Sequence, residues 1–457
     1  MFEKVFKLSE NKTNAKTEIL AGLTTFMTMA YILAVNPNIL GATGMDPTAV
    51  LLATAIASFL GCVCMAFMAN LPFALSAGMG LNAYFAYTVC LGMGYPWQVA
   101  LLAVFVEGII FIIMSLTNVR EAIFNAIPMS LKRAVSVGIG LFIAFIGLQG
   151  AGLVVANPAT KVALTSFHQD AAIPGVEGIT AILAVIGLLV TFILHIKHVK
   201  GSILLGILIT WVLGIICQLT GLYVVNPEAG VFSLIPEMHM TNFGALGETV
   251  GQCFNVDWSS ISIVNFIVVV FAFLFVDVFD TLGTLIGVST KANMLDKDGK
   301  LPAIKPALMA DAIGTTAGAL LGTSTITTFV ESASGVAEGG RTGLTALTTG
   351  VLFLLATLLA PIFTAIPSFA TAPALIMVGF LMFSSITDIK FDDGNILDAI
   401  PAYVCIIAMP LFYSISEGIS WGIITYVVLN VCGGKHKKVT PLMYVLAVLF
   451  IAKYIFL

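Results

Sequence analysis

The stretch GTSTITTFVESA, residues 322–333, and its counterpart PFALSAGMGLNA, residues 72–83, decide the fold of this chain. Both follow long apolar runs, yet both are too rich in Gly, Ser, Thr and Ala to be ordinary spans. Each is expected to begin as a short extended segment and to continue as a short half-helix. Irregular backbone at membrane depth survives only where protein or a water-filled cavity satisfies its N–H and C=O groups. Paired, broken segments of this kind predict a binding site near the bilayer midplane.

The composition is typical of a membrane protein. Of 457 residues, 59% are hydrophobic and 10% are charged, whereas soluble domains carry about 25% charged residues. The net charge of -4 gives no sign of nucleic-acid binding. The seven cysteines are scattered, so neither a disulfide framework nor a metal site is expected, and no cofactor is implied. The polar, basic N-terminus is not expected to be a signal peptide.

Apolar runs of about 20 residues, the length that crosses a bilayer, recur along the chain. The clear ones are 17–38, 49–70, 97–117, 133–153, 178–196, 201–223, 261–287, 303–321, 342–363, 371–388 and 416–433. A shorter run at 398–413 and the interrupted stretches at 73–92 and 323–340 bring the prediction to fourteen transmembrane elements. The apolar tail 440–457 is expected to be either an interfacial helix or a further span.

The basic residues favour this number of elements. With a cytoplasmic N-terminus, 18 of the 20 Lys and Arg residues fall at cytoplasmic ends, and only Lys161 and Lys453 fall elsewhere. The two longest loops, about 154–177 and 224–260, then lie outside and carry acidic residues. The sequence therefore predicts an all-α, multi-pass membrane protein with its N-terminus in the cytoplasm.

Weak internal matches relate elements that are seven places apart. The run ATAI at 53–56 returns as ADAI at 310–313, an offset of 257 residues (310 − 53). Further matches pair 126–130 with 365–368 and 200–207 with 417–423. Because seven is odd, the second half must be inverted relative to the first, which predicts a 7+7 inverted repeat of the transporter type.

Polar residues inside the predicted spans concentrate in elements 1–4 and 8–11. We therefore expect a polar-lined core, made of 17–117 and 261–363. It would move against an apolar gate, made of 118–225 and 364–457 together with the C-terminal tail.

Acidic residues inside these spans mark the candidate site, because a carboxylate at bilayer depth costs at least about 2–3 kcal/mol. The eighth element has a polar stripe at i, i+3, i+4 and i+7, made of Asp277, Asp280, Thr281 and Thr284. The tenth element has a second stripe, made of Thr327, Glu331, Ser334 and Glu338. Other elements add Asp311 and Thr315 from the ninth, and Thr24, Thr28 and Tyr31 from the first.

Glu331 and Asp280 are the strongest candidates for binding a substrate or a proton. Asp277 is either a third proton-coupling group or a partner that orients Asp280. Asn82 is expected in or beside the site, and Phe329 either stacks on a flat ligand or packs in the core. The candidate substrate-binding set is completed by Ser76, Thr328 and Thr25, of which Thr25 equally suits helix–helix packing. Two further buried acids, Asp311 and Glu107, are interpreted as structural.

These groups suit a neutral ligand better than an anion. Carboxylates accept hydrogen bonds and donate one when protonated, and an aromatic ring offers a stacking face. No Lys or Arg is expected inside the core to neutralise a phosphate, a sulfate or a dicarboxylate. A neutral, planar heterocycle with several donors therefore fits, and a buried carboxylate is able to carry a coupling proton.

Several motifs resemble one known family. They are GLTTFMTMAY at 22–31, AGMGLNAYF at 77–85, FDTLGT at 279–284, TFVESASG at 328–335 and GGRTGLT at 339–345. In this order they resemble the AzgA-like branch of the nucleobase–cation symporter-2 (nucleobase–ascorbate transporter) family, and the likeness spans nearly the whole chain. It implies proton-coupled import of hypoxanthine, guanine or adenine, seven plus seven inverted spans divided into core and gate, and a homodimer.

The resemblance also implies roles for single residues. Asp280 and Glu331 would hold the purine, with Glu331 bonding ring nitrogens and Asp280 binding substrate or coupling proton movement. Asn82 falls where the branch has an asparagine important for transport. Uracil and xanthine branches carry Glu in place of Asp280, and the shorter side chain here would leave room for a bicyclic ring. Asp277 has no clear counterpart in those branches.

The sequence thus predicts a secondary-active purine importer that works by proton symport and alternating access, and not an enzyme. The alternative is a same-fold anion transporter or channel, which would favour a basic or neutral residue in place of Glu331. A membrane enzyme is disfavoured because the chain has no His-Glu-x-x-His motif. A receptor or purely structural role has still less support. The preferred purine, and proton against sodium coupling, stay open.

Overall fold

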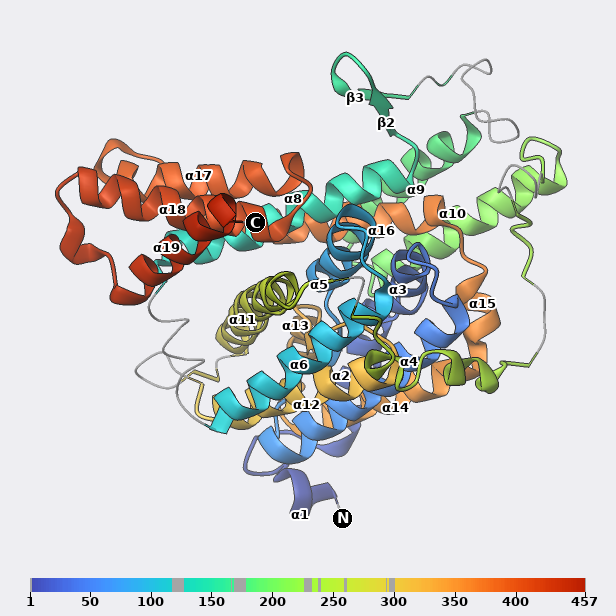
Figure 1. Cartoon of the computed structure of the whole chain (residues 1–457). Helices are drawn as coiled ribbons and strands as arrows, with labels where there is room; N and C mark the ends of the chain where they lie inside the picture. The colour runs from blue at the N-terminus through green and yellow to red at the C-terminus, as the bar shows by residue number, and fades with distance from the viewer. Residues whose placement is uncertain are drawn as a thin grey trace.

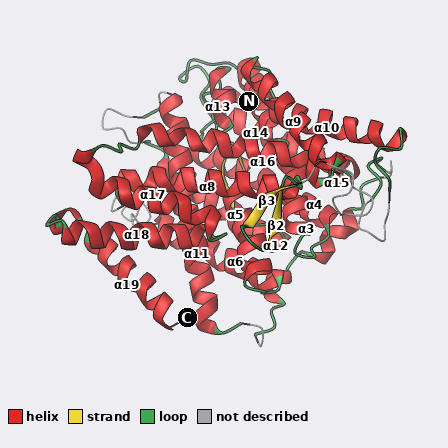
Figure 2. Ribbon diagram, turned by 90° about the horizontal axis from the view of Figure 1, so that it is seen from above, coloured by secondary structure: helices red, strands yellow, loops and turns green. Residues whose placement is uncertain are grey.

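The computed structural model describes residues 2–116, 127–165, 167, 178–225, 232–236, 240–258, 261–292, 294–295 and 301–456. Helices dominate these residues, with two short antiparallel sheets among them (Figures 1 and 2). In this part of the chain, nine helical stretches are long and apolar enough to cross a membrane: Ala15–Gly41, Pro47–Ala69, Trp97–Leu116, Met129–Gly150, Ile179–Ile196, Ser202–Leu219, Gly343–Thr364, Ser368–Asp388 and Ile415–Cys432. The prediction of a mostly helical, multi-pass membrane protein is confirmed.

The elements of the first half alternate between long helices and short, irregular segments. They are α1 (Phe2–Phe6), α2 (Ala15–Met29), α3 (Ile32–Gly41), α4 (Pro47–Cys64), β1 (Leu75–Ala77), α5 (Met79–Ala83), α6 (Trp97–Leu116), α8 (Met129–Gly150), β2 (Val154–Asn157), β3 (Lys161–Leu164), α9 (Ile179–Ile196) and α10 (Ser202–Leu219). π-Helical turns extend α4 over Met65–Ala69 and α5 over Tyr84–Gly92. The predicted interrupted stretch at 73–92 is therefore a strand, a short helix and a π-helical segment.

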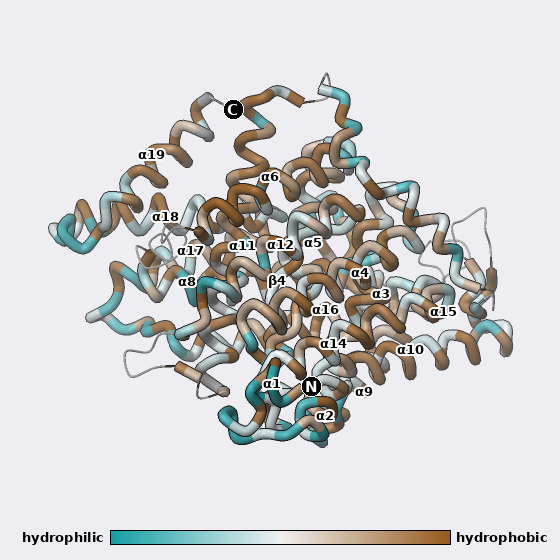
Figure 3. Tube along the Cα trace, turned by 90° about the horizontal axis from the view of Figure 1, so that it is seen from below, coloured by the Kyte–Doolittle hydropathy of each residue, from teal (hydrophilic) through white to brown (hydrophobic). Residues whose placement is uncertain are grey.

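The second half has a related order of elements. They are α11 (Ile263–Lys291), α12 (Ile304–Leu321), β4 (Ile326–Thr328), α13 (Ser332–Ala337), α14 (Gly343–Ala356), α15 (Ala360–Thr364), α16 (Ser368–Phe383), α17 (Ile396–Leu411), α18 (Ile415–Cys432) and α19 (Pro441–Phe456). Again a strand and a short helix, β4 and α13, replace an ordinary span. Figure 3 shows hydrophobic residues along the helices and hydrophilic residues near the N-terminus.

Two features differ from the prediction, and the C-terminal tail is a helix, as both of its expected alternatives require. The first predicted span is divided between α2 and α3 at Ala30 and Tyr31. The tail is helix α19, which packs on α18 and places Phe450 against Phe271 and Phe275 of α11. The hairpin β2–β3, whose strands pair from Val154–Leu164 to Asn157–Lys161, was not predicted, and it is an exception to the all-α prediction.

The long helices form two groups that pack mainly among themselves (Figure 1). One group contains α8, α9, α10, α16, α17 and α18. The other contains α2, α3, α4, α6, α12 and α14. Two elements, α5 and α11, contact helices of both groups, so the segments with the candidate site lie at the boundary.

In the first group, α8 and α16 cross with their backbones in close approach. A Cβ on Gly379 would lie 2.5 Å from the carbonyl oxygen of Gly140 and 2.7 Å from Ala144 Cβ. A Cβ on Gly140 would in turn lie 2.8 Å from the carbonyl oxygen of Gly379. Small residues let membrane helices approach in this way, because packing rather than water exclusion holds them together.

We expect Gly379→Ala to destabilise the protein, since overpacking costs about 1–3 kcal/mol. The matched control is Gly150→Ala at the end of α8, where an added Cβ meets no atom within 4 Å. Thermal unfolding in detergent should show a lower midpoint for Gly379→Ala alone. Equal midpoints for the two variants would contradict the proposed tightness of this crossing.

Candidate functional site

Strands β1 and β4 meet inside the fold and pair antiparallel. The register joins Leu75 to Thr328, Ser76 to Thr327, and Ala77 to Ile326. The ladder is extended at both ends, because Gly78 N–H donates to the Thr325 carbonyl and Phe329 N–H donates to the Ala74 carbonyl, each at 3.0 Å. Both strands are buried. The two interrupted stretches therefore satisfy each other's backbone groups, as irregular backbone at this depth requires.

Glu331 lies where β4 gives way to α13. It is the N-cap residue of α13, but its carboxylate does not cap that helix. Instead, Glu331 Oε1 accepts a hydrogen bond of 2.8 Å from the hydroxyl of Tyr31, at the break between α2 and α3. The Glu331 residue is partly exposed, whereas Tyr31 is fully buried. One carboxylate oxygen is thus held by the first span beside space that solvent reaches.

Asp280, within α11, lies beside the start of the other half-helix, α5. Its Oδ2 atom is 3.3 Å from the position that a Cβ would take on Gly78, the N-cap residue of α5. Glycine at 78 permits this approach, because the same Cβ would also lie 2.5 Å from Thr327 Cγ2. Asp280 is partly exposed and lies within electrostatic range of Glu331. The structure thus brings the two predicted acids together.

Asp277, one turn earlier on α11, has a different environment. It is fully buried and accepts a hydrogen bond of 2.7 Å from the Thr281 hydroxyl. The same hydroxyl lies 3.1 Å from Asp311 Oδ1 of α12 and 2.9 Å from Thr327 Oγ1 of β4. A hydroxyl has one hydrogen to donate, so Asp277 and Asp311 share the Thr281 hydroxyl as a donor. Through these contacts Thr281 connects α11, α12 and β4. This geometry fits a structural role for Asp311.

Asn82 is fully buried inside α5. Its side-chain oxygen accepts a hydrogen bond from the Ser324 hydroxyl, and its Nδ2 atom is 3.4 Å from the Ala77 carbonyl. Ser324 immediately precedes the β1–β4 ladder in the second half. Asn82 therefore links the two broken segments from within, beside the site.

The other predicted residues line or support the ladder. Ser76 exchanges a hydrogen bond of 2.8 Å with Ser58 of α4, and Phe329 is buried at 5% exposure. The buried hydroxyls of Thr25 and Thr328 have no hydrogen-bond partner among the residues that the structure describes. Thr25 approaches Gly335 of α13, which suits its packing interpretation.

Some contacts around the site have no counterpart in the sequence analysis. Glu18 accepts hydrogen bonds from the backbone N–H groups of Arg341 and Thr342 and from the Thr345 hydroxyl, so it satisfies the start of α14. Glu107, predicted to be a buried structural partner, accepts a hydrogen bond of 2.8 Å from Thr325 Oγ1. Acidic residues within apolar runs were the available signal, but sequence did not identify their partners.

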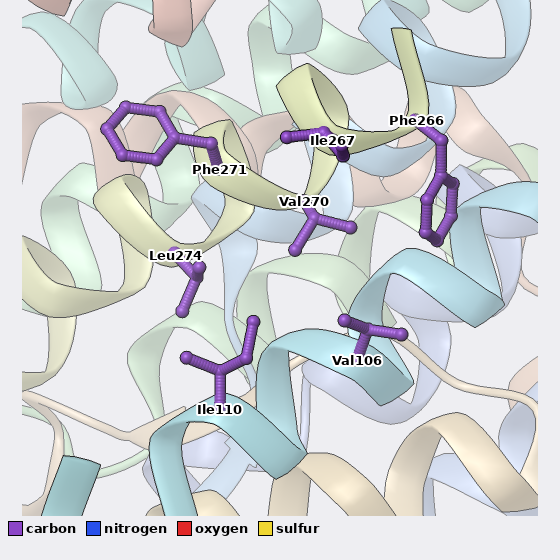
Figure 4. A pocket seen from close by; sticks show the side chains of 7 residues that line it. All are labelled: Val106, Ile110, Phe266, Ile267, Val270, Phe271 and Leu274. Atoms are coloured by element: carbon purple, nitrogen blue, oxygen red, sulfur yellow. The ribbon is translucent and has the colours of Figure 1, made fainter. Parts of the chain in front are cut away.

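An apolar groove of about 220 Å³ opens between α6 and α11 (Figure 4). Its lining is Val106, Ile110, Phe266, Ile267, Val270, Phe271 and Leu274. None of these side chains offers a hydrogen-bonding group, so the groove does not suit a polar ligand. The paired carboxylates of Asp280 and Glu331 remain the better candidate site.

We expect Thr281→Val to be strongly destabilising, because it removes the hydroxyl that Asp277 and Asp311 share. Buried charged groups that lose a hydrogen-bond donor cost about 2 kcal/mol or more. The control is Thr364→Val, since that hydroxyl bonds only to the Ala360 carbonyl of its own helix. Unfolding midpoints in detergent measure both, and a Thr281→Val protein as stable as the control would disprove the junction.

The sequence of this chain is similar to those of known permeases. A permease family model matches residues 16–420. A putative permease of Methanocaldococcus jannaschii is 47% identical over 455 residues, covering 100% of this chain and 98% of the relative. A guanine/hypoxanthine permease of Bacillus subtilis is 44% identical, covering 99% of each chain. An adenine permease of Escherichia coli is 40% identical, covering 100% of this chain and 96% of the relative.

Solved structures share the fold at low sequence identity. The transmembrane domain of a cyanobacterial bicarbonate transporter has a TM-score of 0.61 at 16% identity, covering 89% of this chain and 97% of that domain. A murine anion transporter of solute carrier family 26, in an inward-facing state, has a TM-score of 0.59 at 11% identity, covering 91% of this chain and 68% of the other. At such identities the likeness concerns the fold alone.

Proposed function

The chain belongs to the nucleobase–ascorbate transporter family of permeases, and from this premise we propose that it imports purine nucleobases by secondary active transport. One observation carries the proposal. Two acids inside the fold are partly exposed: Glu331 at the start of α13, and Asp280 of α11, which approaches Gly78 at the start of α5. Guanine/hypoxanthine and adenine permeases at 40% identity or more support a purine as the substrate.

The charge of the site supports a neutral ligand. Neither Asp280 nor Glu331 forms an ion pair with any Lys or Arg in the described part of the chain. Uncompensated carboxylates repel anions but accept hydrogen bonds from ring and exocyclic N–H groups. Phe329 is the candidate stacking surface, and Asn82, Ser76, Thr328 and Thr25 complete the proposed surroundings. The alternative, an anion transporter or channel, has no comparable support in these side chains.

We further propose that a proton accompanies the purine. Asp280 and Glu331 are the candidates for carrying it, because both are partly exposed and close enough to influence each other. Two neighbouring carboxylates hold a proton more readily than one alone. Asp277 is a weaker candidate, since it is buried and already bonded to Thr281.

Alternating access would use the two helix groups. In this proposal the core comprises 17–117 and 261–363, and the gate comprises 118–225 and 364–457, with fourteen transmembrane elements in a 7+7 inverted repeat. The separate packing of the two groups supports the division. The proposed setting is the cytoplasmic membrane, with the N-terminus inside and a homodimer as the assembly.

Uptake by proteoliposomes tests the function directly. Labelled hypoxanthine, guanine or adenine should accumulate without modification, and an inwardly directed proton gradient should increase the rate. Accumulation that ignores the gradient would reject proton coupling, and no uptake of any purine would reject the proposal.

We expect Glu331→Gln to reduce uptake by at least about tenfold, because the amide removes the negative charge that strengthens hydrogen bonds to ligand donors. Asp280→Asn should weaken binding or remove the response to the proton gradient. Both variants should insert and fold, which size-exclusion profiles will check. Normal transport by Glu331→Gln would eliminate its proposed role, and an unchanged gradient response and affinity in Asp280→Asn would make Asp280 structural.

An ion pair joins the proposed gate to the proposed core. Lys200, in the α9–α10 connection, lies 2.6 Å from Glu338 at the end of α13. Exposed pairs contribute about 0.2–1 kcal/mol, enough to bias a conformational equilibrium several-fold. Lys200→Glu or Glu338→Lys alone should therefore alter initial uptake by about twofold, and the double exchange should restore it.

A second pair of the same length provides the control. Lys438 and Asp398 are also 2.6 Å apart, but both belong to the proposed gate. Lys438→Glu should leave the uptake rate unchanged. If exchange of both charges at positions 200 and 338 fails to restore the rate, these residues do not act as a pair between moving units.

A further inference from the structure

The hydroxyl of Tyr31 fixes the position of the Glu331 carboxylate. Tyr31 is fully buried at the break between α2 and α3, and its O–H donates to Glu331 Oε1 at 2.8 Å. The Glu331 backbone also forms a hydrogen bond with this carboxyl group, and Tyr31 is the one other residue, among those that the structure describes, shown bonded to it. The protein therefore holds the carboxylate in place, while the carboxylate keeps acceptor sites for a ligand.

A second contact keeps the same two elements in register. One turn before Tyr31, the Thr28 hydroxyl is 2.9 Å from the Ser334 hydroxyl, which in turn donates to the Glu331 carbonyl at 2.6 Å. The first span thus forms two side-chain hydrogen bonds with this segment, and of these two only the Tyr31 bond involves the carboxylate. Mutations of Thr28 and of Tyr31 can therefore test separately how the α13 backbone is anchored and how the Glu331 side chain is oriented.

We propose that Tyr31 is a positioning residue that sets purine affinity and selectivity through Glu331, an inference that rests on the proposed function. A free glutamate samples several rotamers, and a ligand that immobilises it loses affinity as a result. The Tyr31 hydroxyl holds one rotamer before the ligand arrives. The same hydroxyl also uses one of the positions at which the carboxylate accepts a hydrogen bond. Purines that present a single N–H to Glu331 are therefore favoured.

Guanine and hypoxanthine distinguish the two effects. Both carry a ring N–H, but guanine has an adjacent amino group and so presents two neighbouring donors. A carboxylate with both oxygens free accepts two parallel hydrogen bonds. Loss of the Tyr31 hydroxyl should weaken the binding of both purines while relatively favouring guanine.

The test measures dissociation constants of hypoxanthine, guanine and adenine for the purified full-length protein. In Tyr31→Phe, the affinity for the purine that wild type binds most tightly should fall about tenfold, since a hydrogen bond to a charged group is lost. The ratio of guanine affinity to hypoxanthine affinity should rise by about threefold. This factor is smaller than the tenfold loss, because only part of the free energy of the lost hydrogen bond distinguishes the two purines. Uptake competition should show the same change in ranking.

Two variants separate positioning from packing. Thr28→Val removes the hydrogen bond between Thr28 of α2 and Ser334 of α13, and should affect all purines by the same small factor. Tyr426→Phe removes a buried hydroxyl from α18 and should change nothing. Equal changes for all purines in Tyr31→Phe, or no change, would overturn the positioning role while wild-type purine binding keeps the proposed function. A wild type that binds no purine would overturn both.

Discussion

The rest of the structure depends on how backbone N–H and C=O groups are satisfied where two chain segments stop being helical inside an apolar protein. An unpaired peptide group there costs several kcal/mol (about 2–7). The chain meets this requirement by pairing β1 with β4, three residues from each, and by extending the ladder through Gly78 and Phe329. Each strand needs the other, because neither broken segment can satisfy its backbone alone. The two halves of the chain are therefore joined at this ladder.

This pairing also determines where acidic side chains can lie. A helix that begins inside the protein presents the positive end of its dipole there. Glu331 occupies the first of these starts, and Asp280 approaches the second beside Gly78. Buried hydroxyls then distribute hydrogen bonds among the neighbouring acids, as Thr281 does for Asp277 and Asp311. Hydrogen bonds thus satisfy the buried acids Asp277 and Asp311, whereas Asp280 and Glu331 remain partly exposed.

Much of this arrangement could be predicted from the sequence, because hydrophobic runs and breaks in them are local signals. The strand and half-helix around Ser76 and around Thr327 were expected from their Gly, Ser and Thr content. The Tyr31–Glu331 bond was not, since it joins residues 300 positions apart and depends on how α2 and α13 pack. The break at Ala30 and Tyr31 carries no proline or glycine signal. The hairpin β2–β3 is short and largely exposed, and its apolar residues directly follow a long apolar run, so they do not mark a separate element.

The shared fold of a purine permease family and of anion transporters shows why site chemistry has to be argued separately from architecture. Two half-helix starts that face one another would by themselves favour an anion. In this chain a carboxylate lies at or beside each start, and among the described residues neither carboxylate is ion-paired with Lys or Arg, so the local charge is negative when either acid is ionised. An anion then meets repulsion, whereas a neutral ring with N–H donors meets oriented acceptors. A proton on one carboxylate lowers that negative charge and supplies a donor for a ring nitrogen, which gives a physical reason for the proposed coupling of purine and proton.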